Sequence, residues 1–327
     1  MKLSVVTTLY QSAPHLEEFH ARVSAAVRKI TPEYEIILVN DGSPDASLDL
    51  ALALYERDER TRVVDLSRNF GHYKAIMTGL ARTEGDLVFL IDCDLEEQPE
   101  LISEFHEKMM DTGADVVYGV QAKRRGGLIE RISGSLFYSL FNLLSAWQVP
   151  RNLVTARLMS RRYVRALVQH RDREVFLAGL WAITGFTQVP VTVRKLATSK
   201  STYCFARKAA VLADAISSFS SKPLIYVFYL GFLISALAGT AALWLVIRRL
   251  FFNTMVLGWP SLIVSIWLLG GLSICCTGIL GIYLSKVFLE VKNRPYTIVR
   301  EEYRHRGPAK TRAETGERPI RVISRQV

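Results

Sequence analysis

Two long segments without a single charged residue limit what this chain can fold into more than any other feature. Residues 224–247 and 261–284 contain no Asp, Glu, Lys, Arg or His. A helix of this length crosses a hydrocarbon core of about 30 Å. Without charges inside them, the segments are not expected to carry an ion or a substrate. They predict a transmembrane hairpin over 223–290 that serves as an anchor.

The charges around this hairpin predict its orientation. The link between the two segments carries Arg248 and Arg249, and more cations flank the outer ends of the hairpin. These cations are Lys200, Arg207, Lys208 and Lys222 before it, and Lys286, Lys292, Arg294 and Arg300 after it. The positive-inside rule therefore places the preceding head and the basic tail 291–327 in the cytoplasm. From about residue 307 the tail is polar and has no apolar period, so we expect it to be disordered.

The first 222 residues predict an α/β head domain. Short apolar runs at 3–10, 34–39, 61–66, 87–91 and 115–119 are typical of buried strands. Helical periodicity lies between the first four runs, at about 14–30, 46–58 and 72–83. Strands that alternate with helices indicate βαβ units and a mostly parallel sheet.

Charge and cysteine usage exclude several classes of protein. The net charge is +10, but residues 1–120 hold 11 Lys/Arg against 22 Asp/Glu, so a nucleic-acid partner is not expected. Residues 121–222 hold 17 against 4, which suits phosphates or an anionic membrane surface. The four cysteines have no metal-ligand spacing, which indicates a reduced cytosolic head.

Two amphipathic segments border the basic region. Residues 128–147 and 205–221 carry apolar side chains at helical spacing beside Lys and Arg. Such segments are typical of helices that lie on a membrane surface, although a helix packed on the core of the head has the same pattern.

Polar side chains follow the predicted strands where each one ends. Asp92 and Asp94 come after the strand at 87–91, Asp41 after the second strand and Tyr10 after the first. The carboxyl ends of parallel strands share one edge, and two aspartates there can hold a divalent cation. No glycine-rich phosphate loop is present in the sequence, so a metal is expected to screen a diphosphate. Two structural alternatives remain: Asp94 caps the next helix in a capping box with Glu97, or Asp41 starts an Asx turn.

The chain resembles family 2 glycosyltransferases of the polyprenyl-phosphate type, which have the GT-A fold and include dolichol-phosphate mannose synthases, bactoprenol glucosyltransferases and undecaprenyl-phosphate aminoarabinose transferases. The resemblance covers about residues 3–305. The segments that carry it are Val39-Asn40-Asp41-Gly42-Ser43-Pro44-Asp45, Ser67-Arg68-Asn69-Phe70-Gly71, Asp92-Cys93-Asp94-Leu95-Glu96, Phe219-Ser220-Ser221-Lys222-Pro223-Leu224 and Val291-Lys292-Asn293-Arg294-Pro295.

The resemblance implies a role for each matching residue. Thr8 and Tyr10 contact the base of a nucleotide-sugar, Asp41 contacts the nucleotide, and Asp92 and Asp94 hold Mg²⁺ or Mn²⁺ as the catalytic pair. The remaining substrate-binding positions are Arg124, Arg131, Lys200 and Tyr203. A solvated basic face is the alternative for Arg124 and Arg131. The chain departs from the family in three places. It has Thr8-Leu9-Tyr10-Gln11-Ser12 in place of Pro-x-Tyr-Asn-Glu and so lacks the carboxylate, and it has Gln121 in place of Arg and Thr155 in place of Asp.

The function implied is inverting transfer of one sugar from a UDP- or GDP-sugar to undecaprenyl phosphate at the cytosolic face of the bacterial inner membrane, by an integral membrane protein that can form homo-oligomers. A phosphate monoester is largely a dianion at pH 7, so the absence of a carboxylate at Thr155 does not prevent attack. Two alternatives are a processive polysaccharide synthase and a membrane scaffold or flippase partner with an impaired head. The sequence lacks the Gln-x-x-Arg-Trp motif of processive synthases.

Overall fold

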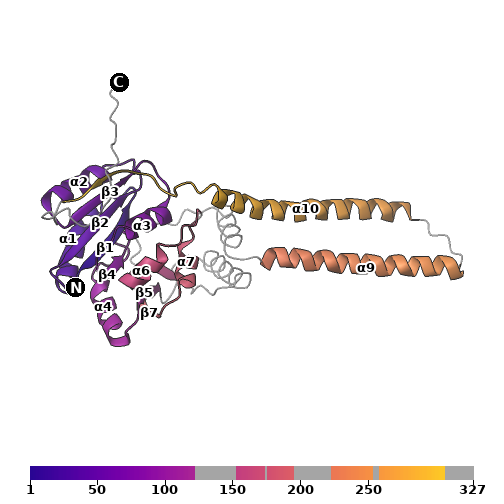
Figure 1. Cartoon of the computed structure of the whole chain (residues 1–327), viewed down its shortest axis with the longest axis horizontal. Coiled ribbons are helices and arrows are strands. Elements are labelled where there is room, and N and C mark those ends of the chain that lie inside the picture. Colours follow the sequence, from indigo (N-terminus) through magenta and orange to yellow (C-terminus); the bar gives the residue numbers. More distant parts are fainter. Residues whose placement is uncertain (122–151, 174, 195–221, 253–257, 306–327) are drawn as a thin grey trace, which may run out of the picture.

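The structure is a computed structural model that describes residues 1–121, 152–173, 175–194, 222–252 and 258–305. It consists of an α/β head and two long antiparallel helices that project from the head side by side (Figure 1). The predicted surface helices at 128–147 and 205–221 lie outside the described residues. So do four predicted substrate-binding residues: Arg124, Arg131, Lys200 and Tyr203.

One eight-stranded sheet forms the centre of the head, in the order β7-β5-β6-β4-β1-β2-β3-β8. Its strands are β1 Leu3–Leu9, β2 Tyr34–Asn40, β3 Thr61–Leu66, β4 Leu87–Leu90, β5 Val116–Gln121, β6 Leu153–Ser160, β7 Gln188–Val193 and β8 Val299–Tyr303. β3, β2, β1 and β4 are mutually parallel, and β7 is parallel to β5. β6 and β8 run antiparallel to their neighbours. The predicted α/β class with a mostly parallel sheet is therefore confirmed.

Helices cover both faces of the sheet, which explains why β1 and β2 are apolar in continuous runs. One core contains side chains of α1 (Leu16–Arg28), α2 (Ser47–Arg57) and α4 (Leu101–Thr112). The other contains side chains of α3 (His72–Leu80), α6 (Arg161–Leu167) and α7 (Leu177–Ile183). Buried side chains recur along α1 at Phe19, Val23 and Val27, the helical spacing expected from the sequence.

The C-terminal tail contributes a strand that the sequence did not reveal. β8 lies within the predicted basic tail 291–327, yet it pairs with β3 at the edge of the sheet. Ion pairs to Glu302 attach it to the head: Arg62 Nη2 lies 2.9 Å from this carboxylate and Arg82 Nε lies 3.1 Å from it. Because β8 has three charged residues between Val299 and Tyr303, it has no apolar run to mark it as a strand.

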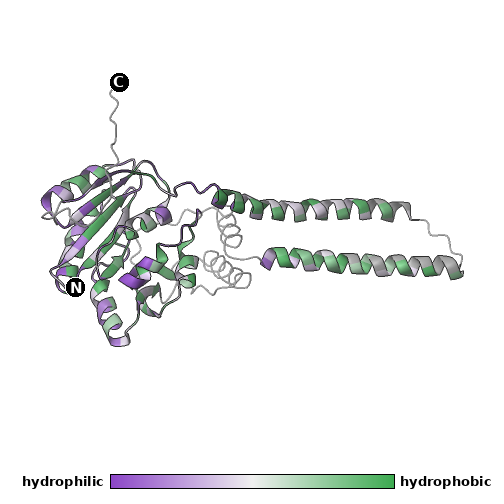
Figure 2. Cartoon of the chain, in the orientation of Figure 1, coloured by the Kyte–Doolittle hydropathy of each residue, from purple (hydrophilic) through white to green (hydrophobic). Residues whose placement is uncertain are grey.

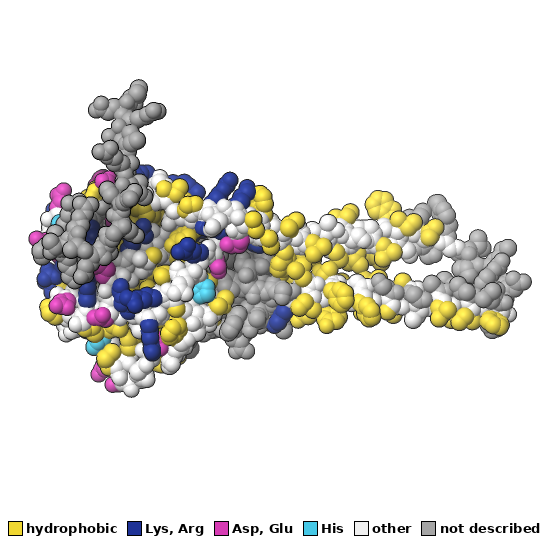
Figure 3. Space-filling view, viewed as in Figure 1, with side chains coloured by type: hydrophobic (Ala, Val, Ile, Leu, Met, Phe, Trp, Pro, Cys, Tyr) yellow, Lys and Arg dark blue, Asp and Glu magenta, His cyan; other side chains and the backbone are white. Residues whose placement is uncertain are grey.

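The two projecting helices contain both of the charge-free segments. They are α9 (Lys222–Phe252) and α10 (Trp259–Val291), and apolar residues follow one another along both (Figure 2). Large apolar side chains such as Phe228 and Trp267 are exposed on them, at 67% and 79% (Figure 3). Within the described residues, the stretch Ser265–Val291 is long and apolar enough to cross a membrane.

Candidate active site

The strand register places Thr8, Asp92 and Thr155 at the same level of the sheet. Thr8 and Asp92 are predicted site residues, and Thr155 is a position where the chain departs from the family it resembles. β1 pairs with β4 from Leu3↔Leu87 to Val6↔Leu90, so two further steps bring Thr8 level with Asp92. On the other side of β4, Leu90 pairs with Arg157, and the same continuation brings Thr155 level with Asp92. The edge predicted to hold the site thus carries Thr8, Asp92 and Thr155 on three neighbouring segments of the sheet.

His72 joins two of the predicted site residues. Its Nδ1 lies 3.0 Å from the Thr8 hydroxyl oxygen, and its Nε2 lies 3.4 Å from Asp92 Oδ1. The sequence analysis missed this histidine. The sequence feature that could have revealed His72 is its position directly after Gly71, where the loop that follows β3 ends and α3 begins. A side chain at that point returns to the edge of the sheet, where the imidazole can fix the orientation of a carboxylate.

The loop that carries the aspartate pair is attached to β6. Asp94 Oδ1 accepts a hydrogen bond from the Glu96 N–H at 3.0 Å, and Leu95 adopts a positive φ of 58°. The buried Glu97 carboxylate accepts hydrogen bonds from the N–H groups of Thr155 at 3.2 Å and Ala156 at 2.7 Å. Glu97 therefore positions the loop rather than a helix terminus.

The capping-box alternative is wrong for this reason. α4 begins only at Leu101, its N-cap residue is Glu100, and no side chain caps it. Asp94 is thus seven residues before the helix, too far to satisfy its first N–H groups. Its carboxylate is part of the loop at the carboxyl end of β4.

Asp41 connects the loops beyond β2 and β3. Its two carboxylate oxygens accept hydrogen bonds from the Phe70 N–H at 2.7 Å and the Gly71 N–H at 3.0 Å. Burial raises the pKa of Asp41 even though both hydrogen bonds oppose that shift. By fixing Gly71, Asp41 also fixes where His72 and α3 start. The Asx alternative is not what is observed, because Asn40 Oδ1 is the atom that accepts the Ser43 N–H, at 3.2 Å.

Tyr10 stands at the open end of the same edge. Its side chain is exposed, at 49%, and the next residue, Gln11, adopts a positive φ of 54°. The Gln11 N–H donates to Ser43 Oγ at 2.7 Å, which joins the loops beyond β1 and β2. An exposed aromatic ring held by a fixed loop is suited to stacking on a nucleotide base. Base contact by Tyr10 and Thr8 and nucleotide contact by Asp41 stay predictions.

Cys93, between the two aspartates, faces the core. Burial, with smaller contributions from the charges of Asp94 and Asp92, raises the pKa of the Cys93 thiol to about 12. A thiol that stays protonated at neutral pH is neither a nucleophile nor a metal ligand. Cys93 thus belongs to the core, whereas Asp92 and Asp94 on either side of it belong to the candidate site.

A buried arginine lies behind the aspartate pair. Arg157 is 1% exposed, and its guanidinium donates to the carbonyl oxygens of Thr155 and Val154, both at 3.2 Å. Its Cζ lies 2.9 Å from the centre of the Trp181 ring. Burial lowers the pKa of Arg157 to about 9, while Tyr163, Glu97, Tyr118 and Asp92 oppose that shift. At pH 7 it is still a cation beside the carboxyl end of the parallel strands, where Asp41, Asp92 and Asp94 lie, which we call the acidic edge.

The donor set fits a divalent cation that is shared with a substrate. Asp92 and Asp94 supply hard carboxylate oxygens, and the Asp92 side chain is 22% exposed, so it is open to a ligand. No cluster of three or more acidic, His or Cys side chains able to hold a metal occurs among the described residues. Two carboxylates leave positions for diphosphate oxygens and water, as Mg²⁺ sites in nucleotide enzymes do.

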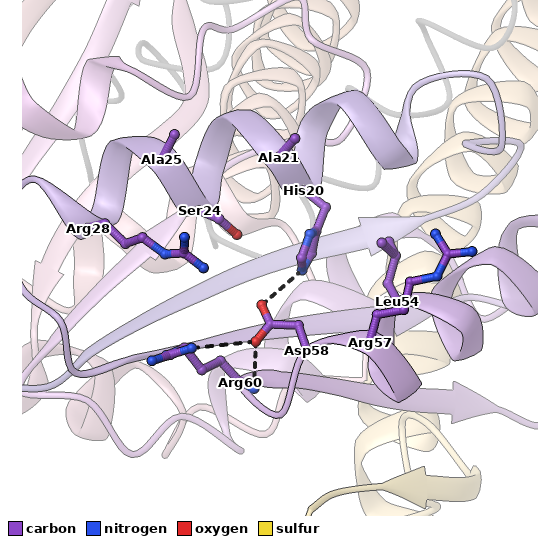
Figure 4. A pocket seen from close by; sticks show the side chains of 9 residues that line it. All are labelled: His20, Ala21, Ser24, Ala25, Arg28, Leu54, Arg57, Asp58 and Arg60. Atoms are coloured by element: carbon purple, nitrogen blue, oxygen red, sulfur yellow. Dashed lines mark hydrogen bonds and ion pairs between the residues drawn. The ribbon is translucent and has the colours of Figure 1, made fainter.

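A hollow of about 460 Å³ lies between α1 and α2 (Figure 4). It is lined by His20, Ala21, Ser24, Ala25, Arg28, Leu54, Arg57, Asp58 and Arg60. Asp58 lies 3.5 Å from His20 and 3.8 Å from Arg60. Because α2 ends and β3 begins there, this hollow is at the amino-terminal end of the strand. It does not belong to the acidic edge.

Comparison with known proteins identifies the family. Residues 4–168, about half of the chain, match the family described as Glycosyl transferase family 2. The chain belongs to glycosyl transferase family 2. A Mycobacterium tuberculosis protein named as a glycosyltransferase is 54% identical over 303 residues, which cover 93% of this chain and 89% of that protein. The chain is therefore a glycosyltransferase with the GT-A-like α/β fold, as the resemblance implied.

Relatives with more specific names cover nearly the whole chain. The bactoprenol glucosyl transferase derived from prophage SfII in Shigella flexneri is 33% identical over 307 residues, which cover 93% of this chain and 99% of the relative. The crystal structure of M. tuberculosis glucosyl-3-phosphoglycerate synthase with UDP is similar to 66% of this chain and 79% of that one, with 22% identity and a TM-score of 0.47. The match to family 2 ends before α9 and α10, whereas the match to the prophage enzyme includes them.

Proposed function

We propose that this family 2 glycosyltransferase transfers a single sugar from a UDP- or GDP-sugar to a polyprenyl phosphate, with inversion, at the cytosolic face of the membrane. The observation that carries the proposal is the joint occurrence of the acidic edge and the two apolar helices in one chain. The edge holds Asp92 and Asp94 at the carboxyl end of the sheet, where α/β proteins bind nucleotides. The helices suit an acceptor that is itself a lipid. A relative named bactoprenol glucosyl transferase has the same extent.

The reaction mainly requires the protein to position the acceptor phosphate and the donor diphosphate. An oxygen of the acceptor phosphate attacks the anomeric carbon, the bond from that carbon to the donor diphosphate breaks, and the nucleoside diphosphate leaves. Because the acceptor is already an anion, the reaction requires no strong base from Thr155. The acidic edge positions the donor. Tyr10 and Thr8 contact its base, and Asp41 fixes the loop that lies against the nucleotide. Positioning of this kind lowers the barrier by removing the need to order the reactants.

Asp92 and Asp94 are the residues that would hold Mg²⁺ or Mn²⁺. A bound divalent cation would neutralise the charge that develops on the departing diphosphate. His72 keeps the Asp92 carboxylate in one orientation, and Glu97 keeps the loop against β6. Arg157 adds a buried positive charge on the same side.

Transfer by the full-length protein in lipid nanodiscs tests the function. UDP- and GDP-sugars are supplied with undecaprenyl phosphate and Mg²⁺ or Mn²⁺, and the lipid product and the released nucleotide are both measured. We expect one sugar per lipid, one nucleoside diphosphate released per transfer, and no product from Asp92→Asn. A growing polymer would indicate a processive synthase instead. Donor binding without any turnover would indicate a scaffold.

We further propose that α9 and α10 both cross the membrane and leave the head and tail in the cytoplasm. The exposed apolar side chains of both helices support this arrangement, because in water so large an apolar surface is unfavourable. Single cysteines at Ser43 and Gly258, each in a background without other cysteines, test it in intact cells. An impermeant maleimide should label only Gly258→Cys. Labelling of Ser43→Cys alone would contradict the orientation.

A further inference from the structure

Three cations from separate segments meet where the head joins α10. Arg68 lies in the loop after β3, Lys74 in the first turn of α3, and Arg173 in the segment between α6 and α7. Residues 293–298 contact the head at Arg173, at Thr78 one helical turn beyond Lys74, and at Ser67 next to Arg68. We call Arg68, Lys74 and Arg173 the cationic seam.

Hydrogen bonds hold the components of the seam in place. The Arg173 N–H donates to Glu290 Oε1 at 2.7 Å, and its guanidinium donates to Asn293 Oδ1. The hydroxyl oxygens of Thr78 and Thr297 lie 2.8 Å apart, one helical turn beyond Lys74. Ser67 N–H donates to the Ile298 carbonyl at 2.9 Å. These bonds fix the segments that carry the three cations, while the Arg68 side chain itself is exposed.

Within the described part of the chain, Asp41 lies near Arg68 and Glu290 accepts the Arg173 N–H, whereas no carboxylate pairs with Lys74. Lys74 is half-buried there and makes no ion pair. Burial lowers the pKa of Lys74, and the positive charges of Arg68 and Arg173 lower it further, with no carboxylate opposing them. The Nε of Arg173 is buried and has no hydrogen-bond partner. Half-burying the Lys74 ammonium without a counter-charge is costly, so this point of the seam is prepared to receive an anion.

The position of the seam identifies which anion fits. On one side it adjoins the C-terminal end of α10, where the chain leaves the proposed membrane span. On the other side Lys74 stands two residues after His72, which contacts Asp92. The first turn of α3 also presents the positive end of the helix dipole. The junction therefore lies between the end of the proposed membrane span and α3, the helix that begins at the acidic edge with His72.

We propose that the cationic seam binds the phosphate of the lipid acceptor and presents it to the acidic edge. This inference rests on the proposed function, and it adds Arg68, Lys74 and Arg173 to the predicted positions Arg124, Arg131 and Lys200. A phosphate monoester carries nearly two negative charges at pH 7. It therefore matches three clustered cations better than a phosphodiester headgroup, which carries one.

Binding and kinetics of Lys74→Gln test the proposal with the full-length protein in nanodiscs. We expect at least a tenfold weaker affinity for undecaprenyl phosphate, measured without donor, and an equal rise in the KM for this acceptor. The KM for the nucleotide-sugar should change less than twofold. Lys74→Arg should restore most of the affinity. Lys29→Gln, an exposed lysine after α1, is the matched control and should behave as the wild type.

Each other outcome would overturn the proposal. An unchanged affinity for undecaprenyl phosphate would exclude the seam as its site. A raised donor KM with unchanged acceptor affinity would assign the seam to the donor diphosphate. A loss of affinity that is equal for undecaprenol, which has no phosphate, or that occurs only in nanodiscs with anionic lipid, would assign it to general membrane attraction. Because acceptor binding is measured without donor, the proposal fails or stands separately from the transfer reaction itself.

Discussion

Charged side chains at the two ends of the parallel strands are used in different ways. At the amino-terminal end they neutralise one another: Glu35 Oε2 lies 3.0 Å from Arg62 Nη1, whose second nitrogen lies 2.9 Å from Glu302. At the carboxyl-terminal end, Asp41 accepts backbone N–H groups and Asp92 faces an imidazole. Charges paired with each other stabilise the fold, whereas charges without an opposite charge can bind a ligand. Asp65, near the carboxyl end of β3, is still paired with Arg300, so the contrast concerns Asp41 and Asp92 rather than every charge at that end.

Removing the carboxylates of the acidic edge should have the largest effect. We expect Asp92→Ala and Asp94→Ala to lower kcat by at least about 1,000-fold, equivalent to about 4 kcal/mol of the barrier, because the departing diphosphate loses its counter-charge. The melting temperature should change little, since neither carboxylate holds a strand in register. Transfer assays and thermal unfolding of the same preparations check both statements. Near-normal metal-dependent transfer by both variants would contradict the assignment of the site.

Breaking the paired end should instead damage the fold. Glu35 and Arg62 are 5% and 6% exposed, so Glu35→Gln removes the buried one of the two carboxylates that lie within 3.0 Å of the guanidinium and leaves Glu302 as the other. We expect a loss of about 3 kcal/mol in the free energy of unfolding. Chemical unfolding monitored by tryptophan fluorescence measures it. Lys29→Gln again serves as the exposed control, and an equal loss in that variant would show that the paired end has no special role.

The same pair predicts a pH dependence. Burial raises the pKa of Glu35, but hydrogen bonds from Ser4, the Glu84 N–H and Arg62, with the charge of Lys2, overcome it and lower the pKa below its ordinary 4.5. The stabilisation is therefore complete above pH 4.5 and is lost as the pH falls through the lower, folded value. Wild type should lose stability in that range, and Glu35→Gln should lose correspondingly less.

His72 should have an intermediate effect, and on the functional end only. We expect His72→Ala to weaken Mn²⁺ binding and to raise the Mn²⁺ concentration for half-maximal transfer about 10- to 100-fold, because Asp92 loses the group that orients it. Calorimetric titration of Mn²⁺ in the presence of UDP gives a readout that does not depend on activity. His20→Ala is the control, because His20 lies in the hollow between α1 and α2, away from the acidic edge. Unchanged metal affinity in His72→Ala would remove His72 from the site.

The smallest change is expected from Thr155→Asp. The Thr155 N–H donates to Glu97, and the Arg157 cation lies nearby with Glu97 and Asp92 around it. A carboxylate added at position 155 would therefore join two carboxylates that are already present. If the acceptor dianion needs no base, kcat should change less than about tenfold, and the rate should rise through the phosphate pKa of about 6 and then level off. A gain of a hundredfold or more would refute the base-free reaction.

The sequence alone determined the βαβ half of the head, the helicity of both charge-free segments and the edge that carries Asp41, Asp92 and Asp94. Those features follow from local periodicity and from the rule that parallel strands end at one edge. Only the tertiary structure decided that β8 closes the sheet, that Glu97 binds β6 and that Asp41 fixes the start of α3.

The contacts of His72 with Thr8 and Asp92, and of Arg173 with Asn293, also depended on the tertiary structure. Each of these contacts joins residues that are far apart along the chain, or involves a single side chain with no repeating pattern. Hydrophobic periodicity reports which face of an element is buried, because many residues contribute to it. A single hydrogen bond or ion pair leaves no such average, and it exists only once the strands and helices have been brought together.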